Sequence, residues 1–152
     1  MEPSSKTPDK WDQRFLDLAR HVAQWSKDPS TNVGCVIVNA DKTIASIGYN
    51  GFPRGVIDDA DRLHDRDTKL AMTLHAEDNA ILSANQQLDG CIAYTWPMPP
   101  CSTCAARLIQ AGVVRVVAPS PGSRWHESCL LGQTMMREAG VCSVWLDDEG
   151  ER

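Results

Sequence analysis

The sequence lacks the features that would place it in a membrane or outside the cell. No apolar run approaches the roughly 20 residues that a helix needs to cross a bilayer. The first ten residues, Met1 to Lys10, are polar and contain no apolar stretch of the kind found in secretory signal peptides. We therefore expect a cytoplasmic protein with no membrane partner.

Basic clusters are also missing. The chain has 15 Lys and Arg against 20 Asp and Glu, a formal net charge of −5, and it contains no run of Lys or Arg. Proteins that grip a nucleic-acid backbone usually carry a basic face that displaces counterions. This balance makes a polynucleotide an unlikely substrate, although a local basic patch remains compatible with it.

No internal repeat and no low-complexity linker divides the chain. With 152 residues, of which 42% are hydrophobic and 23% charged, it can bury one core without disulfide or metal staples. We predict a single domain over residues 1–152, in which residues 146–152 form a loose acidic tail.

The six cysteines are expected to be thiols, because nothing in the sequence points to an oxidising compartment. Two of them, Cys101 and Cys104, have the Cys-x-x-Cys spacing of metal ligands. The other four lie in or beside apolar runs, and we predict that they are small buried hydrophobic residues: Cys35, Cys91, Cys129 and Cys142.

Two short stretches contain the residues of a zinc site, His75-Ala76-Glu77 and Pro100-Cys101-Ser102-Thr103-Cys104. Two thiolates and one imidazole give three protein ligands, which leave the fourth tetrahedral position of Zn²⁺ to water, as in catalytic sites. Glu77 is too close to His75 along the chain to replace it as a ligand. It is well placed to move the protons of that water.

A structural zinc site is the alternative of a different class. In that interpretation His64 or His126 would close a four-ligand cage around the same three residues. A closed cage has no use for the glutamate, so Glu77 favours the open, catalytic site.

The pattern His-x-Glu followed by Pro-Cys-x-x-Cys is the signature of zinc deaminases. Three further segments also match sequences of one branch of these enzymes. They are residues 26–34, 48–55 (Gly-Tyr-Asn-Gly-Phe-Pro-Arg-Gly) and 75–81. From about Trp11 to Val144 the chain thus resembles the cytidine/deoxycytidylate deaminase family, most closely its deoxycytidylate (dCMP) branch. The resemblance implies that His75, Cys101 and Cys104 bind Zn²⁺ and that Glu77 is catalytic.

The expected reaction is hydrolytic deamination of dCMP to dUMP and ammonia. Glu77 would take a proton from the zinc-bound water, protonate ring N3 while hydroxide attacks C4, and later protonate the departing amino group. Three alternatives stay open within the enzyme class: a deaminase of free cytidine or deoxycytidine, one of modified cytidylates, and, least favoured, one of tRNA or other nucleic-acid bases.

Candidate substrate-binding residues lie mostly in loops. Asn50 matches the sugar-binding asparagine of the family, and a purely structural turn asparagine is its alternative. Lys27, Ser30, Thr31 and Arg124 could donate to a phosphate, with solvated surface as the alternative for each. The complete predicted set is Asn50, Lys27, Ser30, Thr31, Ala76, Arg124 and Trp125.

The resemblance also implies regulation and assembly. Relatives with the Gly-Tyr-Asn-Gly run are hexamers that dCTP activates and dTTP inhibits. We therefore expect a homo-oligomer, with a hexamer favoured over a dimer or tetramer, and Mg²⁺ bound with a triphosphate effector. Tyr49, Gly51 and Arg54 are the predicted allosteric residues.

Hydrophobic periodicity predicts an α/β fold, a three-layer α/β/α sandwich with a mixed five-stranded sheet. The first helix should begin at Thr7-Pro8 and end at Asp28-Pro29, with an apolar face of Trp11, Phe15, Leu18, Val22 and Trp25. A hairpin (33–39 and 43–49) should follow, and then a surface loop over 56–72 with at most one helical turn. The remaining predicted elements are helices at 73–86, 101–110 and 126–139, the last with Leu130, Leu131, Met135 and Met136 turned inward, and strands at 91–96, 113–118 and 141–146.

Overall fold

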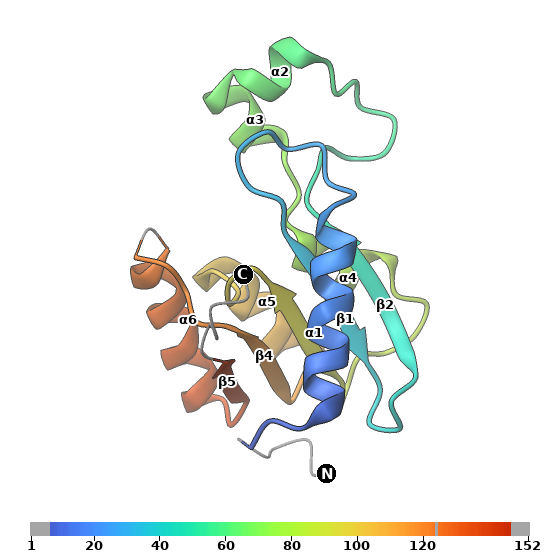
Figure 1. Cartoon of the computed structure of the whole chain (residues 1–152), viewed down its shortest axis with the longest axis vertical. Coiled ribbons are helices and arrows are strands. Elements are labelled where there is room, and N and C mark those ends of the chain that lie inside the picture. The colour runs from blue at the N-terminus through green and yellow to red at the C-terminus, as the bar shows by residue number, and fades with distance from the viewer. Residues whose placement is uncertain (1–6, 124, 147–152) are drawn as a thin grey trace.

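A computed structural model describes residues 7–123 and 125–146 of the chain. Figure 1 shows its helices and strands, which are, in chain order, α1 (Lys10–Ala23), β1 (Gly34–Val38), β2 (Ile44–Tyr49), α2 (Ala60–His64), α3 (Arg66–Met72), α4 (Ala76–Ser83), β3 (Ile92–Trp96), α5 (Ser102–Ala111), β4 (Arg115–Pro119), α6 (His126–Glu138) and β5 (Cys142–Leu146). The predicted tail beyond Leu146 lies outside the described residues.

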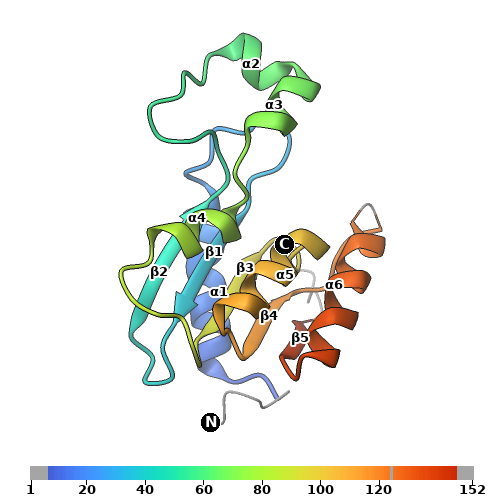
Figure 2. The ribbon, with the colours of Figure 1, turned by 180° about the vertical axis from the view of Figure 1, so that it is seen from behind.

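The sheet has the strand order β2-β1-β3-β4-β5. Strand β1 is antiparallel to β2 and β3, whereas β3, β4 and β5 run parallel to one another. Helix α1 covers one face, and α4, α5 and α6 cover the other (Figures 1 and 2). The predicted three-layer sandwich with a mixed five-stranded sheet is therefore confirmed.

Two apolar clusters fill the space between these layers. On strand β1, Cys35 and Ile37 enter the cluster beneath α4, α5 and α6, while Val36 and Val38 enter the cluster beneath α1. Successive side chains point to opposite faces of a strand, so a strand covered on both faces is mostly apolar. Every residue of β1 and β4 is buried. Strand β1 is apolar throughout, whereas β4 begins with the buried Arg115.

The first helix begins later than Thr7-Pro8 and ends earlier than Asp28-Pro29. Asp9 is its N-cap, since its carboxylate accepts hydrogen bonds from the backbone N–H groups of Trp11 and Asp12. The carboxylate of Asp12 in turn accepts a hydrogen bond from the backbone N–H of Asp9, which completes a capping box. Trp25 lies beyond the helix and is 48% exposed, so it is not part of the buried face.

The prediction of a loop over residues 56–72 is wrong, because this segment forms α2 and α3. The carboxylate of Asp59 caps α2 by accepting from the N–H of Arg62. The two short helices project from one end of the molecule, beside the loop that follows α1 (Figure 1). The described part of the chain thus contains two helices more than predicted.

The inward face of α6 agrees with the prediction in part. Met136 is buried and Met135 packs against the core, as predicted. Leu130 and Leu131, however, are 42% and 56% exposed, and Cys129 and Gly132 complete the buried face. A Cβ at Gly132 would lie 3.1 Å from Cβ of Ala105, so glycine lets α6 approach α5 closely. This close packing sets the rotation of the helix and leaves the leucine pair outside.

The four cysteines outside the metal motif are buried free thiols, as predicted. No helix among the described residues is long and apolar enough to cross a membrane.

Candidate active site

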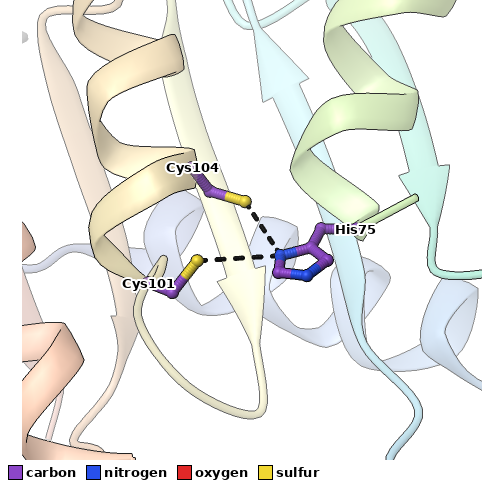
Figure 3. Close-up of side chains that lie close together, drawn as sticks. All are labelled: His75, Cys101 and Cys104. Atoms are coloured by element: carbon purple, nitrogen blue, oxygen red, sulfur yellow. Dashed lines mark hydrogen bonds between the residues drawn. The ribbon is translucent and has the colours of Figure 1, made fainter. Parts of the chain in front are cut away.

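The predicted metal ligands come together where two helices begin. His75 is the N-cap residue of α4, and Cys101 is the N-cap residue of α5, with Cys104 in its first turn. Figure 3 shows the imidazole between the two helix starts, with its Nδ1 atom facing both sulfurs. The partial positive charge of the α5 N-terminus favours thiolates at Cys101 and Cys104.

The three donor atoms have the spacing of a metal site. Nδ1 of His75 lies 3.1 Å from Sγ of Cys104 and 3.7 Å from Sγ of Cys101, and all three atoms lie within 4.8 Å of one another. Tetrahedral Zn²⁺ with its usual bond lengths separates nitrogen from sulfur by about 3.5 Å. The residues present therefore fit a zinc ion.

The site does not have a fourth protein ligand among the described residues. His64 binds the carbonyl of Ala60 within α2, and the ring of His126 packs edge-on against Trp145. Neither histidine belongs to the cluster, so the closed structural cage is not formed within the described ranges 7–123 and 125–146.

The two thiols differ strongly in acidity. Hydrogen bonding from Cys104, opposed by burial and aided by His75, lowers the pKa of Cys101 to about 4. The same contact with Cys101, together with burial, raises the pKa of Cys104 far above its usual range. The two thiols together thus carry one negative charge readily. A metal cation that binds between them would displace the second proton.

Glu77 lies in the first turn of α4 and is 4% exposed. Burial raises the pKa of its carboxyl group to about 7. A carboxyl group with this pKa can both accept and release a proton near neutral pH, as general acid–base catalysis requires.

A cavity of about 260 Å³ opens onto these groups. His75, Ala76, Glu77 and Cys101 line it, whereas Cys104 lies behind them and is fully buried. The other lining residues come from the loop after α1, from the end of β2, from α3 and its C-cap, from the segment after β3 and from the start of α6: Asp28, Ser30, Thr31, Val33, Asn50, Arg66, Lys69, Leu70, Thr73, Met98, Pro99, Trp125, Ser128 and Cys129.

Most of the predicted substrate-binding residues line this cavity, namely Ser30, Thr31, Asn50, Ala76 and Trp125. Lys27 does not, because its exposed ammonium group forms an ion pair with Asp58 at 2.9 Å beside a neighbouring hollow. Arg124 lies outside the described residues.

Asn50 already has a structural role. Its Oδ1 atom accepts from the N–H of Val33 at 2.9 Å, and its Nδ2 atom donates to the carbonyl of Thr31 at 2.9 Å. The 7% exposed side chain therefore ties the end of β2 to the loop before β1 while it lines the cavity. Both interpretations of this residue, turn asparagine and sugar contact, are compatible with its position.

Sequence reasoning missed Lys69 and Arg66, which lie one turn apart on α3 and both line the cavity. Lys69 is only 5% exposed, and its ammonium group donates to Asp28 Oδ1 and Ser30 Oγ at 3.0 Å each. The sequence carries no signal for this burial, because the partners lie 41 and 39 positions away.

The predicted allosteric residues lie apart from the metal cluster. Tyr49 and Gly51 line a second hollow together with Lys27, and the ring of Tyr49 packs edge-on against Trp25. Arg54 is exposed and is not among the residues of either hollow. An allosteric role for the three residues stays a prediction.

A three-ligand metal cluster beside a buried acid–base carboxyl group, in a three-layer α/β/α fold, is the arrangement of a metal-dependent hydrolase. The sequence model described as "Cytidine and deoxycytidylate deaminase zinc-binding region" matches residues 9–120. The chain belongs to the cytidine and deoxycytidylate deaminase family.

Individual relatives agree with this assignment. The chain is 45% identical over 141 residues to an uncharacterised deaminase from the luxG 3′ region of Aliivibrio fischeri, covering 90% of this chain and 94% of that protein. It is 38% identical over 138 residues to the deoxycytidylate deaminase of Mus musculus, covering 87% and 77%. The fold is similar to that of dCMP deaminase from cyanophage S-TIM5 in complex with dCMP and dUMP, with a TM-score of 0.75, 22% identity and coverage of 92% and 99%.

Proposed function

We propose that this protein deaminates dCMP hydrolytically to dUMP and ammonia. The observation that carries the proposal is the open His75, Cys101 and Cys104 cluster with buried Glu77 beside it, in a cavity that also contains two cationic side chains. Relatives from mouse and human that share 38% and 39% of aligned residues are named deoxycytidylate deaminases.

His75, Cys101 and Cys104 would hold Zn²⁺, which supplies a water molecule of lowered pKa when bound. Glu77 would accept one proton as the oxygen of water adds to C4 of the cytosine ring and would deliver that proton to ring N3. It would then accept the second proton from the new C4 hydroxyl group and deliver it to the 4-amino nitrogen, which leaves as ammonia. One water molecule is consumed, and the ring retains its oxygen as the uracil carbonyl.

The electrostatics suit these proton transfers. With a pKa of about 7, Glu77 exists in both protonation states near neutral pH, so it passes protons without a large energetic cost in either direction. Its burial also removes the carboxyl group from bulk water, which would otherwise compete as a proton acceptor.

The 5′-phosphate belongs, on this proposal, at the end of the cavity formed by α3 and the loop after α1. Arg66 provides a guanidinium group there, and Lys69 uses two of its three N–H donors on Asp28 and Ser30. The charge of Asp28 is already balanced by Lys69, so Arg66 leaves this end of the cavity with a net positive charge. Ser30 and Thr31 also line the cavity from the loop after α1, and Trp125 lines it from the start of α6.

The remaining expectations form part of the proposal. Asn50 contacts the sugar in addition to tying the loop. The protein works in the cytoplasm as a homo-oligomer, with a hexamer favoured over a dimer or tetramer, and a triphosphate effector with Mg²⁺ binds near Tyr49 and Gly51. Sedimentation with and without dCTP and Mg²⁺ tests the assembly and the effector together.

Ammonia release from a substrate panel tests the substrate class. The panel contains dCMP, deoxycytidine, dCTP, 5-methyl-dCMP and a single-stranded deoxyoligonucleotide, and we expect the highest kcat/KM for dCMP. Highest efficiency on deoxycytidine would support the free-nucleoside alternative, and highest efficiency on the oligonucleotide would support the nucleic-acid one.

The variant Lys69→Met tests whether the 5′-phosphate binds at the end of the cavity that contains Lys69. It should lower kcat/KM for dCMP by about tenfold or more, since hydrogen bonds to charged groups contribute about 1.5–3 kcal/mol, and change kcat/KM for deoxycytidine far less. Lys10→Met, at the exposed start of α1, is the matched control. An equal loss on both substrates would show that Lys69 only holds the loop of Asp28 and Ser30.

A further inference from the structure

The start of α4 determines where the side chain of His75 points. Its Nδ1 atom faces the two sulfurs, and the residue is the N-cap of α4. Outer-shell contacts orient a metal-binding histidine and tune its affinity for the metal. The direction of the ring therefore also depends on how firmly the backbone at His75 is held.

Asp78 holds that backbone. Its Oδ2 atom accepts a hydrogen bond from the backbone N–H of His75 at 3.2 Å, across the first turn of α4. The Asp78 side chain is only 9% exposed, so its position is well defined. The N–H that it binds belongs to the N-cap residue itself, whose side chain is the metal ligand.

The other carboxylate oxygen of Asp78 reaches the helix that carries the cysteines. Oδ1 of Asp78 accepts from Nη1 of Arg107 on α5. Arg107 lies three positions after Cys104, close to one turn further along the same helix. One carboxylate thus connects the backbone of the histidine ligand to the helix of the thiolate ligands.

We propose that Asp78 and Arg107 form a positioning pair that keeps His75 at ligand distance from Cys101 and Cys104. Neither residue touches the metal position or lines the substrate cavity, so both act through the ligands. The pair holds the backbone of the histidine ligand and fixes α4 relative to α5.

This role differs from that of an ordinary surface ion pair. The side chain of Arg107 is 54% exposed, so its ion pair contributes little to folding stability. Loss of the positioning pair should therefore alter metal retention while the thermal stability of the protein stays nearly constant.

The test measures how fast zinc leaves the zinc-loaded protein when a colorimetric chelator is added in excess. Arg107→Met and Asp78→Asn should each release zinc about tenfold faster than wild type, the lower end of the effect of losing an outer-shell partner. The Tm of the zinc-free variants should equal that of zinc-free wild type. With dCMP, kcat should fall while KM changes by less than about twofold, because the substrate cavity is intact.

Three further variants make the result specific. Arg107→Lys restores a cation and should release zinc at a rate between those of wild type and Arg107→Met. The double variant Asp78→Asn/Arg107→Met should be no worse than the more affected single variant, since the residues act as one unit. Arg137→Met, an exposed arginine in the last turn of α6, is the control and should retain zinc like wild type.

Zinc release at the wild-type rate from both single variants would overturn the proposal. So would strictly additive effects in the double variant, or a lowered Tm of the zinc-free variants with unchanged zinc release. The readout requires no substrate, so it stays informative whichever cytosine compound the enzyme prefers.

Discussion

Buried charged groups lie on both sides of the central sheet, and they are arranged in opposite ways. Beneath α1, the guanidinium of Arg115 donates to both carboxylate oxygens of Asp12 at 2.7 and 2.8 Å, and Tyr94 donates to the same carboxylate at 2.8 Å. Arg115 and Asp12 are completely buried. On the opposite face, buried Glu77 stands at the wall of an open cavity, beside a cluster of three metal-ligand side chains.

The two carboxyl groups differ in whether hydrogen bonds compensate for their burial. The hydrogen bonds from Arg115 and Tyr94 outweigh the effect of burial and lower the pKa of Asp12, so this carboxylate stays ionised and inert. Burial without such compensation raises the pKa of Glu77 to about 7, which suits the role of proton carrier that we propose for it. The first group therefore supports the fold, and the second is suited to the proposed chemistry.

The largest expected effect comes from Glu77→Gln, which removes the proton carrier and keeps its shape. Deamination of dCMP should fall by about 10²–10⁴-fold, the usual loss of a general acid–base group. Zinc content and the free energy of unfolding should stay near wild type, because glutamate is not a metal ligand. Turnover rates and metal analysis of the purified variant provide both values, and near-normal turnover would refute the assigned role of Glu77.

The converse experiment is Arg115→Met. Removing one partner of a buried ion pair leaves the other charge uncompensated, so the free energy of unfolding should drop by about 3–5 kcal/mol. The kcat of the protein that remains folded should be unchanged.

Urea unfolding and assays at low temperature check the two halves of this prediction. The double variant Asp12→Asn/Arg115→Met removes both charges and serves as the control, because it should be less destabilised than Arg115→Met. A stable Arg115→Met variant with low kcat would show that Arg115 contributes to catalysis and not to folding, against the difference drawn between the two faces of the sheet.

Asn50→Ala tests a residue that both stabilises the fold and lines the cavity. Leaving a buried hydrogen-bonding partner unpaired costs about 1–3 kcal/mol, so kcat/KM for dCMP should fall more than about tenfold. The loss should be much smaller for 2′,3′-dideoxycytidine monophosphate, which lacks the 3′-hydroxyl group. Equal losses on the two substrates would assign Asn50 to the loop contacts with Val33 and Thr31 alone.

The smallest expected effect is a dependence of stability on acid pH. The pKa of Asp12 in the folded protein lies below its ordinary value of 3.8, so its contribution is complete above that pH and is lost as the pH falls towards the folded pKa. Wild type should therefore lose more unfolding free energy than Asp12→Asn between about pH 6 and about pH 3. Urea titrations at several pH values measure both slopes, and parallel slopes would mean that Asp12 is not specially stabilised.

The cluster of His75, Cys101 and Cys104 was predictable from the sequence because its information is local. The Cys-x-x-Cys spacing places both thiols at the start of one helix, and His75 with Glu77 occupies the start of another. The hairpin of β1 and β2 and the buried strand β4 were predictable for the same reason, since their patterns repeat over a few residues.

What escaped prediction depends on contacts between distant segments. Residues 56–72 show no apolar stripe, and the burial of Lys69 on α3 depends on Asp28 and Ser30 in another loop. The inward face of α6 depends on the fit of Gly132 against Ala105, not on its leucines. The sequence predicts a start of α1 at Thr7-Pro8, whereas the capping box of Asp9 and Asp12 sets the start in the structure.

X-ray absorption spectroscopy of the zinc-loaded protein tests directly whether one metal position is open to solvent. A catalytic site built from Cys101, Cys104 and His75 predicts two sulfur neighbours at about 2.3 Å, one imidazole nitrogen at about 2.0 Å and one exchangeable light atom from solvent. A competitive inhibitor that reaches the metal should change only that last neighbour. Two imidazole nitrogens, or a spectrum that no inhibitor alters, would reveal a closed structural site and contradict the account.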